Sequence, residues 1–218
     1  MREVFVYVEG PSDQSAMRSL LAAPRELAAT KGFLLDFYPL RSKKELLNKG
    51  PLKALNILRN RADSCVFLVP DLYPRNVAFP HSTYQELKSE LESRFMAELR
   101  RKGAADRLME RFRVHCFKHD LEVLLLASEG PLMQRLNVKA FSRKWANPVE
   151  DQNHDHPPKR VVEGLFSDSG MTYKDTVDAP WVLERSDYRM LQDKCSQNFK
   201  PFLKDLFEAL GLPSLMQP

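Results

Sequence analysis

The chain opens with MREVFVYVEGPSD, residues 1–13, and this stretch decides the fold. Residues 4–8 are all β-branched or aromatic, which is typical of a strand buried on both faces, as in a parallel sheet. The apolar run ends at Glu9, a Gly-Pro pair then breaks the strand, and Ser12 stands where a helix N-cap would. The pattern predicts that Glu9 lies at the carboxyl end of a strand, where open α/β sheets place their ligand sites. A solvated acid at a strand end is the alternative.

The composition is that of a folded protein with one hydrophobic core. The chain has 218 residues, 43% of them hydrophobic, and its 33 basic and 29 acidic residues give a net charge of +4. This excess permits a polyanionic partner without requiring one. The three cysteines are far apart, so we expect reduced thiols in a cytoplasmic protein. The early strand leaves no room for a signal peptide, and no apolar run approaches the ~18 residues of a membrane span.

Strands and helices alternate along the first part of the chain. The predicted strands are 3–9, 34–40, 64–71 and 111–120. The predicted helices are 12–30, with Met17, Leu20, Leu21 and Leu27 on its apolar side, 43–62, split in two by Gly50 and Pro51, 83–104 and 120–129. This alternation predicts a parallel α/β sheet of about four strands flanked by helices.

After Gly130 the sequence shows only helix and loop signals. Residues 145–160 are polar and rich in Pro, Asn and Asp, which indicates a loop, and helical patterns follow near 160–167, Tyr173 and 198–211. The last helix carries an apolar stripe made of Phe199, Phe202, Leu203, Leu206, Phe207 and Leu210. We therefore expect an α/β domain over 1–130 and a helical extension over 131–218, packed together as one structural unit.

Acidic residues follow three of the four predicted strands. Glu9 follows the first strand, Asp71 the third, and Asp120 with Glu122 the fourth. Because the carboxyl ends of parallel strands meet at one edge of a sheet, these side chains are expected to converge. Carboxylates gathered in this way repel one another unless a cation neutralises them, and hard oxygen ligands suit Mg²⁺ or Mn²⁺ completed by a substrate phosphate.

The order of these motifs resembles the Toprim domain, the catalytic module of topoisomerases, primases and nucleases. That family places a Glu after its first strand and a DxD motif after its third, and the two hold divalent metal. The sequence is more similar to the Toprim domains of OLD-like (overcoming-lysogenization-defect) nucleases, and most similar to a bacterial family of similar length encoded beside ABC-type ATPases. The resemblance rests on VEGPSD (8–13), FLVPDLY (67–73), FP (79–80), KHDLEVLLLA (118–127), HPPKR (156–160), Tyr173-Lys174 and CSQNFKPFL (195–203).

The third motif departs from the Toprim pattern. The chain has Asp71-Leu72-Tyr73 in place of DxD, so the second acid is absent. The resemblance implies that Glu9, Asp71 and Glu122 hold the metal, with Asp13 or Asp120 contributing. Either Asp13 or Glu122 supplies the missing oxygen, or the site binds metal weakly. Asp13 has a second interpretation as a cap or dipole partner of the helix that begins beside it.

Four further residues are candidates for the site. His119 neighbours the acids and would act as a proton shuttle, a Mn²⁺ ligand or a phosphate contact; a structural His bonded to the backbone is the alternative. Lys159, Arg160 and Lys174 are candidates for binding a substrate phosphodiester, and a solvated helix start is the alternative.

The resemblance implies a metal-dependent Toprim nuclease that cleaves DNA or RNA, with Glu9, Asp71, Glu122 and His119 as its catalytic residues. It also implies action with an ABC-type ATPase in bacterial defence against phage, and it allows a homodimer. The competing hypothesis is a catalytically inactive Toprim-fold subunit that docks on or regulates an ATPase complex, and the missing second acid favours it.

Overall fold

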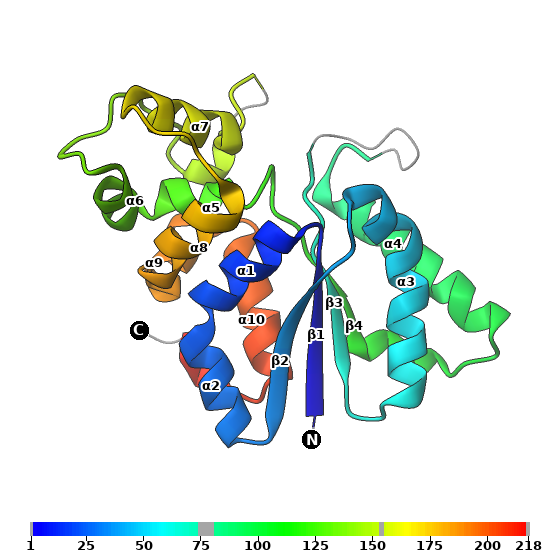
Figure 1. Ribbon diagram of the computed structural model, residues 1–218. Helices are drawn as coiled ribbons and strands as arrows, with labels where there is room; N and C mark the ends of the chain where they lie inside the picture. The colour runs from blue at the N-terminus through cyan, green and yellow to red at the C-terminus, as the bar shows by residue number, and fades with distance from the viewer. Residues whose placement is uncertain (1, 74–80, 153–154, 217–218) are drawn as a thin grey trace.

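The protein is an α/β structure built on one parallel sheet with helices on both faces (Figure 1). The computed structural model describes residues 2–73, 81–152 and 155–216. Its strands are β1 (Arg2–Val8), β2 (Phe33–Pro39), β3 (Cys65–Leu68) and β4 (Phe112–Val114). Its α-helices are α1 (Pro11–Leu20), α2 (Ala22–Thr30), α3 (Lys43–Asn60), α4 (Tyr84–Arg101), α5 (Glu122–Ala127), α6 (Glu129–Leu136), α7 (Pro158–Asp168), α8 (Asp175–Glu184), α9 (Tyr188–Lys194) and α10 (Phe199–Ala209). Short 3-10 helices span Asp106–Arg111 (η1), Val149–Asp151 (η2) and Pro213–Met216 (η3).

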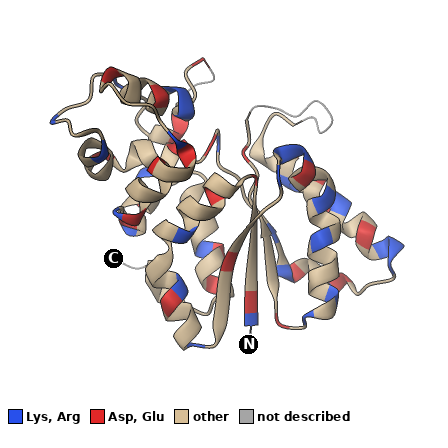
Figure 2. Cartoon of the chain, viewed as in Figure 1, with Lys and Arg blue, Asp and Glu red and all other residues tan. Residues whose placement is uncertain are grey.

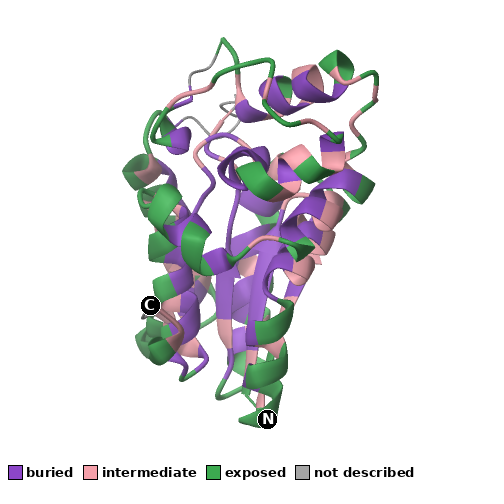
Figure 3. Cartoon of the chain, turned by 90° about the vertical axis from the view of Figure 1, so that its left-hand side faces the viewer, coloured by how far each residue is buried: buried purple, intermediate pink, exposed green. Residues whose placement is uncertain are grey.

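The sheet has the strand order β2-β1-β3-β4, and every pair is parallel. Alternate residues of the strands point to opposite faces, so each face has its own core. Val4, Val6 and Val8 of β1 pack with α1, α2 and the helices from α5 to α10, whereas Phe5 and Tyr7 pack with α3 and α4. The strands are buried between these two layers (Figure 3). The structure confirms the predicted fold class.

The C-terminal helices share a core with the sheet. The buried cluster that contains β1 and α5 also contains α6 to α10, and α8 packs against α1. All six predicted stripe residues of α10 are buried. The hydrophobic core therefore crosses residue 130 without interruption.

Two predicted helices begin or break at different places in the structure. The predicted helix 12–30 is two helices separated at Leu21, because Pro24 has no N–H with which to continue the hydrogen bonding of the first helix. The first helix is capped by Gly10 rather than Ser12. Leu27 was predicted to face the core and is 38% exposed.

The predicted break at Gly50 and Pro51 is wrong, because α3 continues through both residues. Gly50 is buried against the sheet, where an added Cβ would lie 2.9 Å from Leu68 Cδ1. This close packing holds the helix against β3 and offsets the hydrogen bond that Pro51 cannot donate. The predicted helix 120–129 corresponds to α5, which ends at Ala127, two residues earlier than predicted. Helix α6 begins at Glu129, after Ser128.

Strands β3 and β4 are shorter than predicted. Beyond them the backbone pairing becomes irregular: Phe117 N–H donates to the Pro70 carbonyl at 3.3 Å, and Leu72 N–H donates to the Phe117 carbonyl at 2.6 Å. These bonds keep the segment around Asp71 beside the segment around Phe117, beyond the last regular residues of β3 and β4. The residues 74–80, which include the FP motif, lie outside the described residues.

All three cysteines are free thiols, as predicted. Among the described residues, no helix is both long enough and apolar enough to cross a membrane.

Candidate active site at the carboxyl edge of the sheet

The sheet topology points to one place for a ligand site. After β1 the chain turns to β2 on one side, and β3 then returns to pair with β1 on its other side. In open α/β sheets, ligands bind outside the carboxyl ends of the strands where the order reverses in this way. Glu9 directly follows β1, and Asp71 lies three residues beyond β3. The two acids therefore flank the topological switch point.

A cavity of about 370 Å³ lies at this edge. Figure 2 shows acidic residues near the ends of the strands, below α5 and α7. The lining includes the four acids predicted to converge, Glu9, Asp71, Asp120 and Glu122, and also Asp13 and Lys159. Among the described residues, no three His, Cys, Asp or Glu side chains form a group that could hold a metal ion as they stand. The five acids thus share a cavity without forming a ready-made ligand cluster.

Glu9 and Asp71 are in direct contact. The backbone N–H of Asp71 donates to Glu9 Oε1 at 3.0 Å. Burial raises the pKa of Glu9 to about 7, although this hydrogen bond and the charge of Lys43 oppose the rise. Burial, followed by the negative charge of Glu9, raises the pKa of Asp71 well above its usual range. Burial of the pair, together with the charge of Glu9 acting on Asp71, therefore favours the protonated form of these two carboxyl groups.

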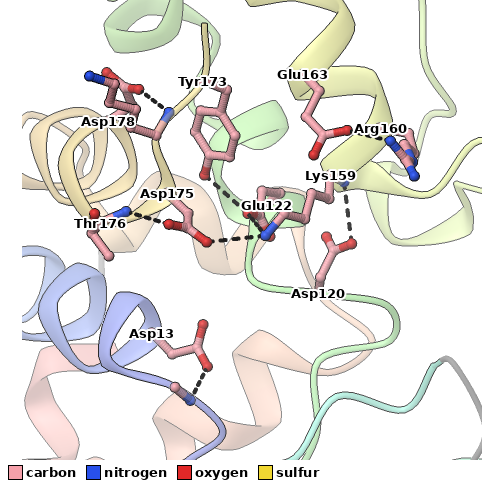
Figure 4. A network of polar contacts seen from close by, with 12 residues as sticks. Asp13, Asp120, Glu122, Lys159, Arg160, Glu163, Tyr173, Asp175, Thr176 and Asp178 are labelled. Atoms are coloured by element: carbon pink, nitrogen blue, oxygen red, sulfur yellow. Dashed lines mark hydrogen bonds and ion pairs between the residues drawn. The ribbon is translucent and has the colours of Figure 1, made fainter. Parts of the chain in front are cut away.

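Asp13 caps helix α1 and also lines the acidic cavity. Its Oδ2 accepts the Gly10 N–H at 2.9 Å, which satisfies a free donor at the start of α1 (Figure 4). Burial and the charge of Glu122 raise its pKa to about 6. The capping role predicted for Asp13 is confirmed, and the side chain also belongs to the acidic cavity.

Asp120 lies just before α5 and Glu122 is the first residue of α5, and both line the same cavity as Asp13 (Figure 4). Asp120 Oδ2 accepts the Lys159 N–H at 3.3 Å, whereas its buried Oδ1 has no hydrogen-bond partner in the described part of the chain. Burial and the neighbouring Glu122 raise the pKa of Asp120 to about 8. Glu122 accepts the Tyr173 hydroxyl at 3.0 Å, and burial raises its pKa as well.

Two lysines supply positive charge at the acids, and Arg41 also lines their cavity. Lys159 Nζ lies 3.6 Å from Glu122 Oε1 and 3.2 Å from Asp175 Oδ2. Burial lowers the pKa of Lys159, but the two carboxylates outweigh it and the net shift is upward. Lys43, the first residue of α3, is close enough to Glu9 and Asp71 for their charges to raise its pKa, although burial brings the net shift below its usual value.

The other predicted site residues lie at different distances from this cavity. His119 and Arg160 line an adjoining cavity of about 540 Å³, which shares Tyr73, Asp120 and Lys159 with the acidic one. His119 is buried, with its ring 5.3 Å from that of Tyr73. Arg160 is exposed and pairs with Glu163 at 3.0 Å.

Lys174 is not among the residues that line either cavity. It is exposed, and its backbone N–H donates to Asp178 Oδ2 at 2.6 Å as the chain enters α8. The structure therefore does not bring its predicted substrate-binding side chain to the acids.

Sequence reasoning missed three contributors to the site. Lys43 follows the end of β2, and that position was itself a signal, because a residue there lies at the same sheet edge as Glu9. Tyr173 was noted only as part of a motif, and its hydroxyl contacts Glu122. Asp175 comes from a part of the chain with no strand nearby, so no sequence pattern pointed to it.

The raised pKa values predict how stability depends on pH. Glu9, Asp13 and Asp120 have folded-state pKa values of about 7, 6 and 8, well above their usual values. The folded state then binds more protons than the unfolded state, so the free energy of unfolding falls as the pH rises from about 4 to 8. Asp120→Asn removes one such group, and we expect the variant to gain stability relative to the wild type between pH 5 and pH 8.

Urea unfolding at pH 5, 6, 7 and 8 measures this difference. The exposed Asp63, which precedes β3 at the opposite edge of the sheet, provides a matched control as Asp63→Asn. An Asp120→Asn curve parallel to that of the wild type would show that the cavity does not raise the pKa of this carboxyl.

Comparison with known proteins gives one match. No curated protein and no solved structure matches the chain. The family described as "Domain of unknown function (DUF4276)" matches residues 8–207, which include all of the acids at the sheet edge. The chain therefore belongs to the DUF4276 family.

Proposed function

We propose that this protein is a divalent-cation-dependent nuclease whose active site is the acidic cavity at the carboxyl edge of the sheet. The observation that carries the proposal is the set of five carboxyl groups in one cavity, whose pKa values are all raised. A carboxyl group in a cleft whose pKa is strongly raised is a candidate for a functional site. Burial is the largest cause in all five groups, and a bound cation, added to Arg41, Lys43 and Lys159, would favour their ionised forms.

The donor set fits a hard cation. Every acidic group in the cavity offers carboxylate oxygens, which Mg²⁺ and Mn²⁺ prefer, and the buried Asp120 Oδ1 has no protein donor among the described residues. Glu9, Asp71 and Glu122 would hold the ion, with Asp13 or Asp120 contributing. When bound, such an ion polarises a phosphate and lowers the pKa of an attacking water.

Residues of the protein would bind the substrate phosphates and transfer a proton. Lys159, held between Glu122 and Asp175, would neutralise charge on the phosphate that enters the cavity. Arg160 is exposed beside the adjoining cavity and would bind a neighbouring phosphate. His119 lines the adjoining cavity together with Asp120 and would act there as a proton shuttle.

The sequence supports a more specific assignment to the Toprim nucleases. The motifs VEGPSD and KHDLEVLLLA, which carry the resemblance, place Glu9, Asp13, Asp120 and Glu122 around the same cavity. By this resemblance the protein would act in the cytoplasm as the nuclease of an anti-phage system, together with an ABC-type ATPase that senses infection.

One observation favours the alternative of a docking or regulatory subunit. Tyr73 stands where the Toprim pattern has a second acid, and its hydroxyl donates to the Ser82 carbonyl at 3.0 Å. A phenol that bonds a backbone oxygen supplies no charged ligand. The nuclease proposal therefore depends on the four other acids of the cavity to complete the site with Asp71.

Incubating the purified protein with plasmid DNA, single-stranded DNA and tRNA tests the proposal. We expect cleavage of at least one substrate with Mg²⁺ or Mn²⁺, and none when EDTA removes the ion. Intact substrates in every reaction, with the ATPase partner present as well, would contradict the nuclease proposal and favour the docking subunit.

A further inference from the structure

A chain of hollows leads away from the acidic cavity over the C-terminal helices. The adjoining cavity, which contains His119, shares Arg160 with a hollow of about 250 Å³. That hollow shares Arg143 and Lys144 with a larger one of about 530 Å³, between α5, the start of α6, the end of α9 and the segment 141–149. Each hollow thus shares lining residues with the next, from this larger hollow, called here the distal hollow, to the acidic cavity.

The distal hollow combines aromatic rings with cations. Phe141 and Trp145 lie in its wall with ring centroids 4.8 Å apart and planes inclined at 67°. Both rings are half-buried, so part of each remains accessible. Arg143, Lys144 and Lys194 surround them. An aromatic wall bordered by cations is the arrangement that binds a base by stacking and its phosphate by charge.

The positive charge continues along the path. Four cations (Arg143, Lys144, Lys194 and Arg160) and one acid (Glu129) carry the formal charges in the distal hollow and the next one. Lys194 pairs with Glu129, whereas the exposed Lys144 forms no ion pair with any described residue. Lys144 therefore offers its full charge to an anion from solvent.

Arg143 is fixed at the junction of the two hollows. Its guanidinium forms two hydrogen bonds with Asp168, at 2.7 and 2.9 Å. It lies across α7 at Gly164, where an added Cβ would be 2.6 Å from Arg143 Cζ. The glycine and the carboxylate together hold a planar cation in one orientation between Trp145 and the path to Arg160.

We propose that the substrate is a single strand of nucleic acid, with an unpaired base bound against Trp145 in the distal hollow and the backbone running past Lys144 and Arg160 to the acidic cavity. The inference rests on the proposed function, because it names the substrate of the same active site. Bases in a duplex are stacked inside it, so a recessed aromatic wall selects unpaired bases. DNA and RNA strands share this chemistry.

Binding to labelled oligonucleotides tests the inference independently of cleavage. Asp71→Asn serves as the parent protein. Fluorescence anisotropy compares its affinities for a 15-nucleotide oligo-dT, a 15-nucleotide oligo-U and a 15-base-pair duplex. We expect both strands to bind more tightly than the duplex, and the tighter strand distinguishes DNA from RNA. Trp145→Ala should weaken single-strand binding about 5- to 150-fold, the range found for one stacked base, and Trp145→Phe should restore most of it.

Lys144→Glu provides a second variant at an exposed position, where the fold is not at risk. It should weaken binding and reduce the slope of log Kd against log salt by about one, as for the loss of one phosphate contact. Arg107→Glu is the matched control: the same charge reversal on exposed η1, which precedes β4 and so lies at the opposite sheet edge. It should bind as the parent does.

Three outcomes would overturn the inference: no binding of either strand, tighter binding of the duplex, or affinities of Trp145→Ala and Lys144→Glu within twofold of the parent. Cleavage by the wild type with unaltered binding by Trp145→Ala would leave the proposed function standing and remove this inference. If single-strand binding depends on Trp145 but the wild type cleaves no substrate, the binding surface stands and the proposed nuclease function is removed.

Discussion

Asp71→Asn should lower the rate of phosphodiester cleavage about 100-fold or more and leave the protein folded. Removal of one group that stabilises the transition state costs this much in other enzymes, and an acid that holds the catalytic ion should count for no less. Asn has the size of Asp, and the contact with Glu9 uses the backbone N–H of residue 71. Since the pKa of Asp71 is raised, loss of its charge also relieves repulsion in the cavity.

Cleavage, partner binding and protection of cells from phage should be measured together for this variant. We expect cleavage and protection to disappear together while binding to the proposed ATPase partner persists. Asp63→Asn makes the same chemical change on the exposed surface and should alter none of the three. If protection survives the double change Glu9→Gln and Asp71→Asn, the nuclease hypothesis fails and the docking subunit takes its place.

Glu150→Ala should destabilise the protein by about 2–4 kcal/mol, the largest stability effect that we expect for a polar residue here. The Glu150 side chain is only 1% exposed and accepts the backbone N–H groups of Gln197, Asn198 and Phe199 at 2.6–3.3 Å. These are donors at the start of α10, which the helix itself does not satisfy. Alanine would leave all three N–H groups without this carboxylate, and the N–H of Phe199 is buried.

Guanidinium unfolding measures this effect, and Glu150→Gln separates its causes. Glutamine keeps one acceptor oxygen and loses the charge that favours a helix N-terminus, so we expect it to fall between alanine and the wild type. The neighbouring Asp151 is exposed and serves as a control in Asp151→Ala. A Glu150→Ala variant as stable as the wild type would show that water replaces the carboxylate at no cost.

The strands could be predicted because their signal is local. Every residue from Val4 to Val8 favours a strand, and the Gly-Pro pair that follows ends it, so the position of Glu9 at the sheet edge followed from thirteen residues. Helix continuity could not be predicted in the same way. Gly50 and Pro51 look like a break, yet α3 continues because Gly50 packs against Leu68, eighteen positions further along the chain.

The acids of the site could be predicted, and their environment could not. Glu9, Asp71, Asp120 and Glu122 follow strands, and parallel strands end at one edge, so their convergence follows from topology. The residues that contact these acids come from other parts of the chain. Lys43 is the first residue of α3, Tyr173 precedes α8, and Lys159 forms an ion pair with Asp175. Burial, which is the main cause of the raised pKa values, depends on how the C-terminal helices cover the edge and leaves no local pattern.

We propose that the carboxylates at the sheet edge bind a divalent cation, and the melting temperature with and without Mn²⁺ measures this binding. At about 100 times its Kd, a ligand of the native state adds about 2.7 kcal/mol, which corresponds to a rise of about 5–10 °C for a chain of this size. Glu9→Gln retains an acceptor for the Asp71 N–H and removes one charge from the cavity. We expect it to fold and to lose most of the Mn²⁺-dependent rise, while Asp63→Asn keeps it. A rise of the same size in Glu9→Gln and in the wild type, or no rise in the wild type, would contradict the claim.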